Sequence, residues 1–401
     1  MNKTLTDYLH ATLPADGLAG TLVGRAWLPA TGTMPAGPAV VALRSDGLYD
    51  LSAAAPTISQ LVELDDPAAT VRATPGRHVG SLDAVLANTA AVERNPAVPY
   101  LLAPCDLQVI KAAGVTFAAS MLERVIEEQA KGDPQGAAQV REQVQAVVGS
   151  SLSSVRPGSP EADALKALLV EKGMWSQYLE VGIGPDAEIF TKAPLLSAVG
   201  TGVEIGLHPD SAWNNPEPEV VLSIDSRGRV VGAMLGNDVN LRDFEGRSAL
   251  LLSKAKDNNA SCALGPFLRL FDGTFSIDDV RAAKLDLRVD GPDGFVLRGS
   301  SSMDQITRDP LDLAAQAIGT THQYPDGLVL FLGTLFAPIE DRDAPGGGFT
   351  HKLGDMVTIS SDKLGMLVNR VNRSDHVAPW TFGVTALMRN LAARGLLEGG
   401  R

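Results

Sequence analysis

The alternation of apolar and polar residues predicts a small β-rich unit at the start of the chain. Runs such as GTLVGRAWL and AVVALRSDGLYDLS read as short strands, and Asp46-Gly47 forms a turn signal between two apolar segments. Thr57 and Ser81 are capping residues that precede apolar patterns, so a short helix is expected to begin at each of them.

A proline-rich connector follows this unit. Residues 95–105 contain three prolines, which keep the backbone extended and suit a link between domains. We therefore predict a small N-terminal domain over residues 1–105 and a larger catalytic domain over residues 106–401.

The larger part changes from helical to strand-like character. Residues 117–148 have a helical pattern interrupted near 132–134, and Ser159-Pro160 predicts another helix start. Beyond about residue 180 strands dominate: KLDLRVD with FVLRG and VTIS with MLVNRV predict hairpins, and GLVLFLGT is apolar enough for a strand covered on both faces. Because strands far outnumber alternating strand–helix units, we expect an α+β fold with a mixed or antiparallel sheet. Three short helices are expected in this part, at 276–283, 309–318 and 384–394.

Composition narrows the possible partners. The 401 residues carry 34 Lys and Arg against 47 Asp and Glu, a net charge of −13, which disfavours nucleic acids and anionic membranes. An anionic substrate therefore requires a bound metal or nearby Lys and Arg side chains that reverse the negative potential locally.

The first residues lack the apolar core of a signal peptide, no run is long enough to span a bilayer, and Cys105 and Cys262 fit no disulfide framework. We therefore expect a cytoplasmic protein.

One stretch, EPEVVLSIDSRGRVVGAMLGND, predicts a strand, a tight turn and a second strand. If Arg227-Gly228 form a two-residue turn, opposed residues have numbers that sum to 455, so Glu217 faces Asp238. Side chains alternate along a strand, so Glu219 lies on the same face as both. The opposite face is apolar and consists of Val220, Leu222, Ile224, Val231, Ala233 and Leu235.

Three carboxylates on one face repel one another unless a cation binds between them. Oxygen ligands suit Mg²⁺, Mn²⁺ or Ca²⁺, and the absence of a nearby His or Cys argues against zinc. We favour Mg²⁺ with open positions for a substrate. A strand that carries ordinary solvated acids is the alternative interpretation.

Four motifs resemble those of the fumarylacetoacetate hydrolase superfamily. They are E-x-E at 217–219, N-D-x-x-x-R-D at 237–243, A-K at 255–256 and G-P at 265–266, in the order and spacing of that family. The resemblance covers about residues 106–401. It implies a mixed β-sandwich roll around a divalent metal, preceded here by the smaller β-rich domain.

The resemblance also implies roles for single residues. Glu217, Glu219 and Asp238 would be the metal ligands, and the C1 carboxylate and C2 ketone of a 2-oxo acid would complete the coordination, so that the metal stabilises an enolate. Lys256 corresponds to the family lysine near the reacting carbonyl. Further positions that match the family are Lys192 as a cation for the substrate, Thr334 as a hydroxyl donor to its carboxylate, and Arg242 as a second candidate substrate contact or a partner of the ligand carboxylates.

The chain departs from the family's hydrolases at one position. Those enzymes carry a His and Glu dyad in a helix after G-x-x-[YF]; here Gly114 to Phe117 supply that segment and Glu123 is retained, but Ser120 replaces the histidine. Serine cannot act as a base near neutral pH, so hydrolysis of a carbon–carbon bond is disfavoured and lyase chemistry is favoured. Glu123 is the candidate for proton transfer, unless it is an ordinary surface glutamate, and Ser120 shares its helix face.

Longer segments, including WNNPEPEVVL and the run from Gly236 to Phe267, resemble the 2-keto-3-deoxypentonate (xylonate or arabinonate) dehydratase branch of this superfamily. The implied reaction is enolisation and loss of the C4 hydroxyl to give 2,5-dioxopentanoate (α-ketoglutarate semialdehyde) in pentose catabolism, by a homodimer or homotetramer. Two alternatives remain: a diketo-acid hydrolase of the acylpyruvate type, and a non-catalytic binder of oxo acids.

Overall fold

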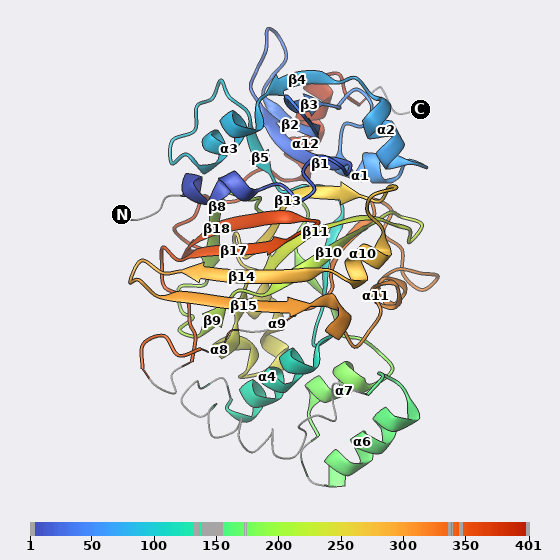
Figure 1. The fold of residues 1–401 in the computed structure, drawn as a ribbon, viewed down its shortest axis with the longest axis vertical. Helices are drawn as coiled ribbons and strands as arrows, with labels where there is room; N and C mark the ends of the chain where they lie inside the picture. Colours follow the sequence, from blue (N-terminus) through green and yellow to red (C-terminus); the bar gives the residue numbers. More distant parts are fainter. Residues whose placement is uncertain are drawn as a thin grey trace.

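The computed structural model describes residues 5–131, 155–171, 175–335 and 348–397, with a few positions between these ranges. The larger of its two main sheets has eleven strands in the order β4-β3-β2-β1-β13-β11-β10-β16-β6-β7, with β5 paired to β1 (Figure 1). Its described strands pair antiparallel except β16 and β6, which are parallel. Their bounds are β1 Leu22–Leu28, β2 Gly37–Arg44, β3 Gly47–Asp50, β4 Arg77–Gly80, β5 Tyr100–Leu102, β6 Val109–Ala113, β7 Ile189–Ala193, β10 Pro218–Ile224, β11 Val230–Asp238, β13 Cys262–Leu270 and β16 Leu328–Phe331.

A second sheet of five strands has the order β15-β14-β17-β18-β8. Its strands are β8 Val203–Leu207, β14 Lys284–Asp290, β15 Val296–Ser302, β17 Met356–Ser361 and β18 Gly365–Arg373, and a separate two-stranded ladder joins β9 Asn214–Asn215 to β12 Asn240–Leu241. Both predicted hairpins are confirmed, because β14 pairs with β15 and β17 with β18. Val220, Leu222 and Leu235 of the larger sheet share one core cluster with Leu287 and Ile359 of the smaller. The chain therefore has the expected mixed-sheet α+β architecture.

The first hundred residues extend the larger sheet, since β1 pairs with β13 at Val23 and Leu268. The two predicted helix caps are confirmed: Thr57 accepts a hydrogen bond from the Gln60 N–H and Ser81 one from the Ala84 N–H. The domain boundary near residue 105 stays a prediction. The helices of this region are η1 Leu5–Ala11, α1 Ile58–Val62, α2 Pro67–Ala73 and α3 Leu82–Ala90, and α12 Val384–Ala393 packs back onto β2.

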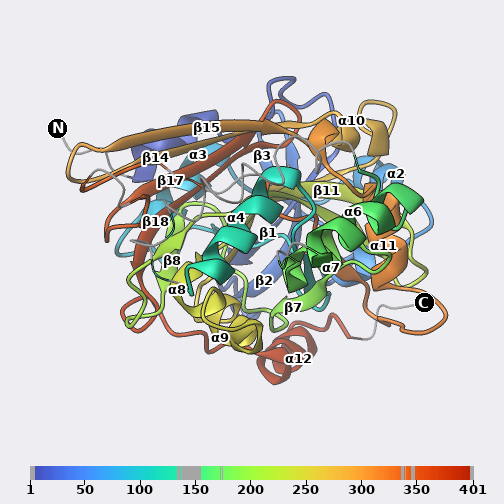
Figure 2. The same ribbon diagram turned by 90° about the horizontal axis from the view of Figure 1, so that it is seen from below.

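A helical layer lies at the end of the molecule opposite the N-terminal strands (Figure 1). Seen from below, α4 Ala118–Gln129, α6 Pro160–Glu171 and α7 Gln177–Ile183 lie in front of the strands (Figure 2). The helix predicted at Pro160 is confirmed, whereas most of residues 132–148 lie outside the described residues. The remaining helices are α8 Arg242–Glu245, η3 Ala249–Leu251, α9 Leu252–Lys256, α10 Ile277–Arg281, η4 Met303–Gln305 and α11 Pro310–Ala317. Within the described part of the chain, no helix has the length and apolarity to cross a bilayer.

The β10–β11 hairpin has the predicted register up to its turn. Opposed numbers sum to 455 from Pro218 to Ser223, but a bulge then pairs Ile224 with Val230. The two-residue turn predicted at Arg227-Gly228 was wrong, because the Asp225 N–H donates to the Arg229 carbonyl and the Asp225 carboxylate accepts from the Arg227 and Arg229 N–H groups.

The bulge also moves one residue to the other face of the hairpin. Val231, predicted beside Val220, instead clusters with Val221 and Met234. Both faces of β10 are buried, so the acidic side of the hairpin is covered by other elements of the protein.

Candidate metal centre

Three acidic side chains converge where β10 and β11 lie opposite each other. Glu217, Glu219 and Asp238 each offer one oxygen within 4.8 Å of the others, and they are only 2%, 1% and 1% exposed. The Asp238 N–H donates to the Glu217 carbonyl at 3.0 Å, so the two residues are opposed as predicted. The sequence expectation that these acids meet is therefore confirmed, and the interpretation as solvated acids is wrong because the cluster is buried.

The chemistry of this cluster fits a hard divalent cation. Burial and the neighbouring carboxylates of Asp238 and Glu217 raise the pKa of Glu219 well above its usual value, although the Gly333 N–H donates to it at 2.7 Å. Three charges therefore resist being held together unless a cation binds between them. The donors are all oxygens, which Mg²⁺ and Ca²⁺ prefer. No other group of three His, Cys, Asp or Glu side chains converges in this way among the residues that the structure describes.

Two buried lysines border the acidic cluster, as predicted. The Lys256 ammonium, at the end of α9, hydrogen-bonds to Glu217 and lies 3.0 Å from Asp238 Oδ2. Lys192 Nζ, on β7, lies 2.8 Å from Asp238 Oδ1. Burial acts to lower the pKa of Lys256, but the Asp238 and Glu217 carboxylates hold it above its usual value. Burial likewise acts to raise the pKa of Asp238, which the two ammonium groups hold below its usual value. The lysines thus bring local positive charge to the acidic cluster of this acidic protein.

An arginine that the sequence analysis missed completes the charge network. Arg124 of α4 donates to Glu217 Oε1, pairs with Glu127, and lies 3.2 Å from Glu245. Arg242, one of whose expected roles was to partner the ligand carboxylates, instead lies 3.1 Å from Glu127 and is one step removed from the acidic cluster. The guanidinium of α4 is thus the one that contacts Glu217, and both expected roles of Arg242 stay predictions. The helical spacing of Ser120, Arg124 and Glu127 was the signal that could have revealed this face.

The other predicted residues belong to two segments that contact the acidic cluster through neighbouring residues, namely α4 through Arg124 and the segment after β16 through Gly333. Ser120 is buried and its hydroxyl donates to the Phe117 carbonyl at 2.9 Å, within the first turn of α4. Glu123 is half-buried on the same helix, where the neighbouring Arg124 makes the contact to Glu217. Thr334 is buried and directly follows Gly333, which places it beside Glu219. The roles of these side chains in substrate binding and proton transfer stay predictions.

Glu188 is a second residue that the sequence analysis missed. It directly precedes β7, and an added Cβ on Gly114 would lie 1.9 Å from Glu188 Oε2, so only glycine leaves room for this carboxylate. Burial and then the nearby Glu245 raise its pKa to about 7, against the opposing charges of Lys256 and Arg124. A carboxyl group with this pKa can take and give protons near neutral pH. No spacing pattern in the sequence connects residue 188 to the acidic cluster.

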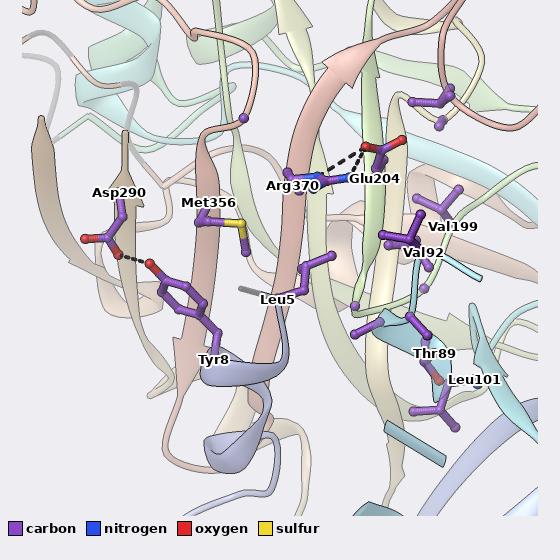
Figure 3. A pocket seen from close by; sticks show the side chains of 18 of the residues that line it. Leu5, Tyr8, Thr89, Val92, Leu101, Val199, Glu204, Asp290, Met356 and Arg370 are labelled. Atoms are coloured by element: carbon purple, nitrogen blue, oxygen red, sulfur yellow. Dashed lines mark hydrogen bonds and ion pairs between the residues drawn. The ribbon is translucent and has the colours of Figure 1, made fainter. Parts of the chain in front are cut away.

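A large cavity lies elsewhere, between the N-terminal region and the smaller sheet (Figure 3). It has a volume of about 1150 Å³. The Tyr8 hydroxyl donates to Asp290 at 3.1 Å, and Arg370 pairs with Glu204, so these polar groups are already paired within its wall (Figure 3). The acidic cluster, which gathers three buried carboxylates with two buried lysines, is the stronger candidate for chemistry.

Comparison with known proteins supports this choice. The family described as fumarylacetoacetate (FAA) hydrolase C-terminal matches residues 199–372. The 2-dehydro-3-deoxy-D-arabinonate dehydratase of Saccharolobus solfataricus is 29% identical over 186 residues, which cover 46% of this chain and 59% of that protein, less than two thirds of its length. The Haloferax volcanii protein named "Probable 2-keto-3-deoxyxylonate dehydratase" is 25% identical over 335 residues, 83% of this chain and 94% of that protein.

A solved structure has the same fold. The 2-keto-3-deoxy-D-arabinonate dehydratase complexed with magnesium and 2,5-dioxopentanoate matches with a TM-score of 0.55 and 19% identity, over 88% of this chain and 99% of that one. All three acids of the cluster, as well as Lys256, lie inside the segment that the family matches. Residues 199–372 of this chain are therefore a domain of the fumarylacetoacetate hydrolase superfamily.

Proposed function

We propose that this protein is a divalent-cation-dependent hydro-lyase that converts a 2-keto-3-deoxypentonate to 2,5-dioxopentanoate. The observation that carries the proposal is the buried cluster of Glu217, Glu219 and Asp238 with Lys192 and Lys256 at its border. Two relatives are named as dehydratases of 2-keto-3-deoxy sugar acids, and a protein of the same fold binds magnesium together with 2,5-dioxopentanoate. These names support the substrate class.

The acidic cluster would hold the cation through its three carboxylates. A bound divalent cation withdraws electron density from a chelated 2-oxo acid and thereby makes the hydrogens on C3 more acidic. Lys256, which contacts Glu217 and Asp238, would stabilise negative charge that develops on the C2 oxygen. Lys192 adds a second positive charge for the substrate's carboxylate.

Proton transfer is assigned to a glutamate. Glu188 has a carboxyl group whose raised pKa suits both removal of a C3 proton and its return. Glu123 on α4 is the second candidate, and Ser120 lies one helical turn before it. The electron pair left on C3 after removal of its proton forms a C3=C4 double bond as the C4–O bond breaks, and the leaving hydroxyl takes up a proton and departs as water. A proton then moves from C5 to C3, and the C4–C5 enol tautomerises to the C5 aldehyde.

Incubation of purified protein and Mg²⁺ with both C4 epimers of 2-keto-3-deoxypentonate tests the proposal. We expect the semialdehyde product from at least one epimer and no pyruvate from a diketo acid. Pyruvate from the diketo acid would favour the hydrolase, and tight binding without any product would favour the non-catalytic binder. Glu217→Ala is the matched control, because it should abolish both binding and turnover, whereas Glu188→Gln and Glu123→Gln separately test the proton-transfer group.

A further inference from the structure

The register of the β10–β11 hairpin continues beyond its last strand residues. Asn215 of β9 pairs with Asn240 of β12, and their numbers again sum to 455. Side chains alternate along each strand, so Asn215 lies on the face of Glu217 and Asn240 on the face of Asp238. The intervening Val239 belongs to the hydrophobic core on the opposite side. The Asn215 and Asn240 amides are therefore a directly opposed pair that continues the row formed by Glu219, Glu217 and Asp238.

Both asparagines are completely buried, yet most of their polar atoms lack a protein partner. Within the described part of the chain, neither polar atom of the Asn240 amide makes a hydrogen bond, and Asn215 Oδ1 makes none. Only Asn215 Nδ2 is paired, to the Pro216 carbonyl at 2.9 Å. Leaving buried amide groups unpaired is costly, so native proteins rarely do it without a reason.

The adjacent Asn214 provides a contrast. It points to the other face, where its amide donates to Ser211 Oγ at 3.1 Å and accepts from the His351 N–H at 3.2 Å. Within the β9–β12 ladder, the missing partners therefore distinguish Asn215 and Asn240 from Asn214. They are not a general feature of this ladder.

From this geometry we propose that Asn215 and Asn240 form the subsite that recognises the terminal C5 hydroxyl of the substrate, an inference that rests on the function proposed above. These polar side chains form a row along the hairpin. Glu219, which accepts from the Gly333 N–H, lies at one end, and the two asparagines lie at the other. Asn215 is two residues from Glu217, a distance of about 7 Å along an extended strand. Glu217, Glu219 and Asp238 would hold the cation that binds the oxo-acid end of the substrate, and a substrate lying along this row would bring its terminal hydroxyl to the amides. An amide both donates and accepts, as a hydroxyl does, so the pair matches this group.

Recognition of a hydroxyl by buried polar groups has a measurable consequence. A site of this kind rejects an analogue that lacks the hydroxyl, because its own polar atoms are then left unpaired. The asparagines would therefore determine specificity for hydroxylated oxo acids. Simple aliphatic oxo acids would bind more weakly.

Calorimetric binding to the Mg²⁺-loaded protein tests the inference with two ligands of equal chain length. 5-Hydroxy-2-oxopentanoate has the terminal hydroxyl but no C4 leaving group, and 2-oxopentanoate has neither. We expect the wild-type protein to bind the hydroxylated ligand at least tenfold more tightly. Asn240→Ser and Asn215→Ala should each reduce this preference to about twofold and leave the affinity for 2-oxopentanoate unchanged. Asn214→Ala, the matched control, should lower the melting temperature and retain the preference.

Equal binding of the two ligands by the wild-type protein would overturn the inference without the use of any variant. A parallel loss of affinity for both ligands in the asparagine variants would also overturn it, because the amides would then support the metal ligands. A protein that dehydrates the pentonate without this preference refutes the subsite alone. A protein with the preference but no turnover supports the subsite and refutes the dehydratase activity.

Discussion

Gly114→Ala tests how closely the position of Glu188 controls turnover. The new Cβ would lie 1.9 Å from Glu188 Oε2 and 2.7 Å from its Cδ, whereas real Cβ contacts do not fall below 3.0 Å. The carboxylate must therefore move by about 1.1 Å, the difference between 3.0 and 1.9 Å. The rest of the fold can remain in place, because the clashing atoms belong to the end of a flexible side chain.

The expected loss follows from this displacement. A misplacement of about 1 Å in a reacting group can reduce the rate about 100-fold, so we expect kcat for semialdehyde formation to fall by about that factor. The free energy of unfolding should fall by only about 1–3 kcal/mol, as for other overpacked sites. The Kd for Mg²⁺ should not change, since the three atoms nearest to the new Cβ all belong to Glu188 and none to the acidic cluster.

A double-mutant cycle separates this effect from a general disturbance. If Gly114 acts through Glu188, the variant Gly114→Ala/Glu188→Gln should be no slower than Glu188→Gln alone. Gly273→Ala is the control, because its Cβ would meet no atom within 4 Å. A wild-type kcat in Gly114→Ala, or fully additive effects in the double variant, would refute the assigned role of Glu188.

Four further predictions concern the metal, the ionisation of Glu188 and the charge network. Glu217→Gln should abolish Mg²⁺ binding in calorimetry, and a chelator should stop turnover of the wild-type protein until Mg²⁺ is added back. A base must be ionised to remove a proton, and the pKa of Glu188 is raised to about 7. The value of kcat/KM should therefore rise with pH through about 7, and this rise should be absent in Glu188→Gln. The same raised pKa means that folding favours the protonated carboxyl, so the contribution of Glu188 to stability should fall as the pH rises from about 4.5 to 7. Arg124→Met removes the cation that Glu127 and Glu245 share, and should lower the free energy of unfolding in urea by about 3–5 kcal/mol; an unchanged midpoint would contradict the network.

Local patterns in the sequence were sufficient to predict the hairpin that carries the acidic cluster. The alternation of side chains along a strand and the antiparallel register bring Glu217, Glu219 and Asp238 to one face without knowledge of the remaining chain. The caps at Thr57 and Ser81 were predictable for the same reason, since each depends on a few adjacent residues. The turn was wrong by one residue because a bulge costs little and leaves no clear pattern in the sequence.

Tertiary structure alone decided what surrounds the hairpin. Arg124 reaches Glu217 because α4 lies across this end of the molecule, and Glu188 approaches the site because β7 follows β16 and β6 in the sheet order. These contacts join segments separated by long stretches of chain. The periodicity of apolar residues in the sequence shows which face of a helix or strand is buried, but it does not show which other element covers that face. Burial then distinguishes this cluster from ordinary surface acids: the same carboxylates in water would repel each other weakly, whereas inside the protein their repulsion is strong and favours positive charge beside them.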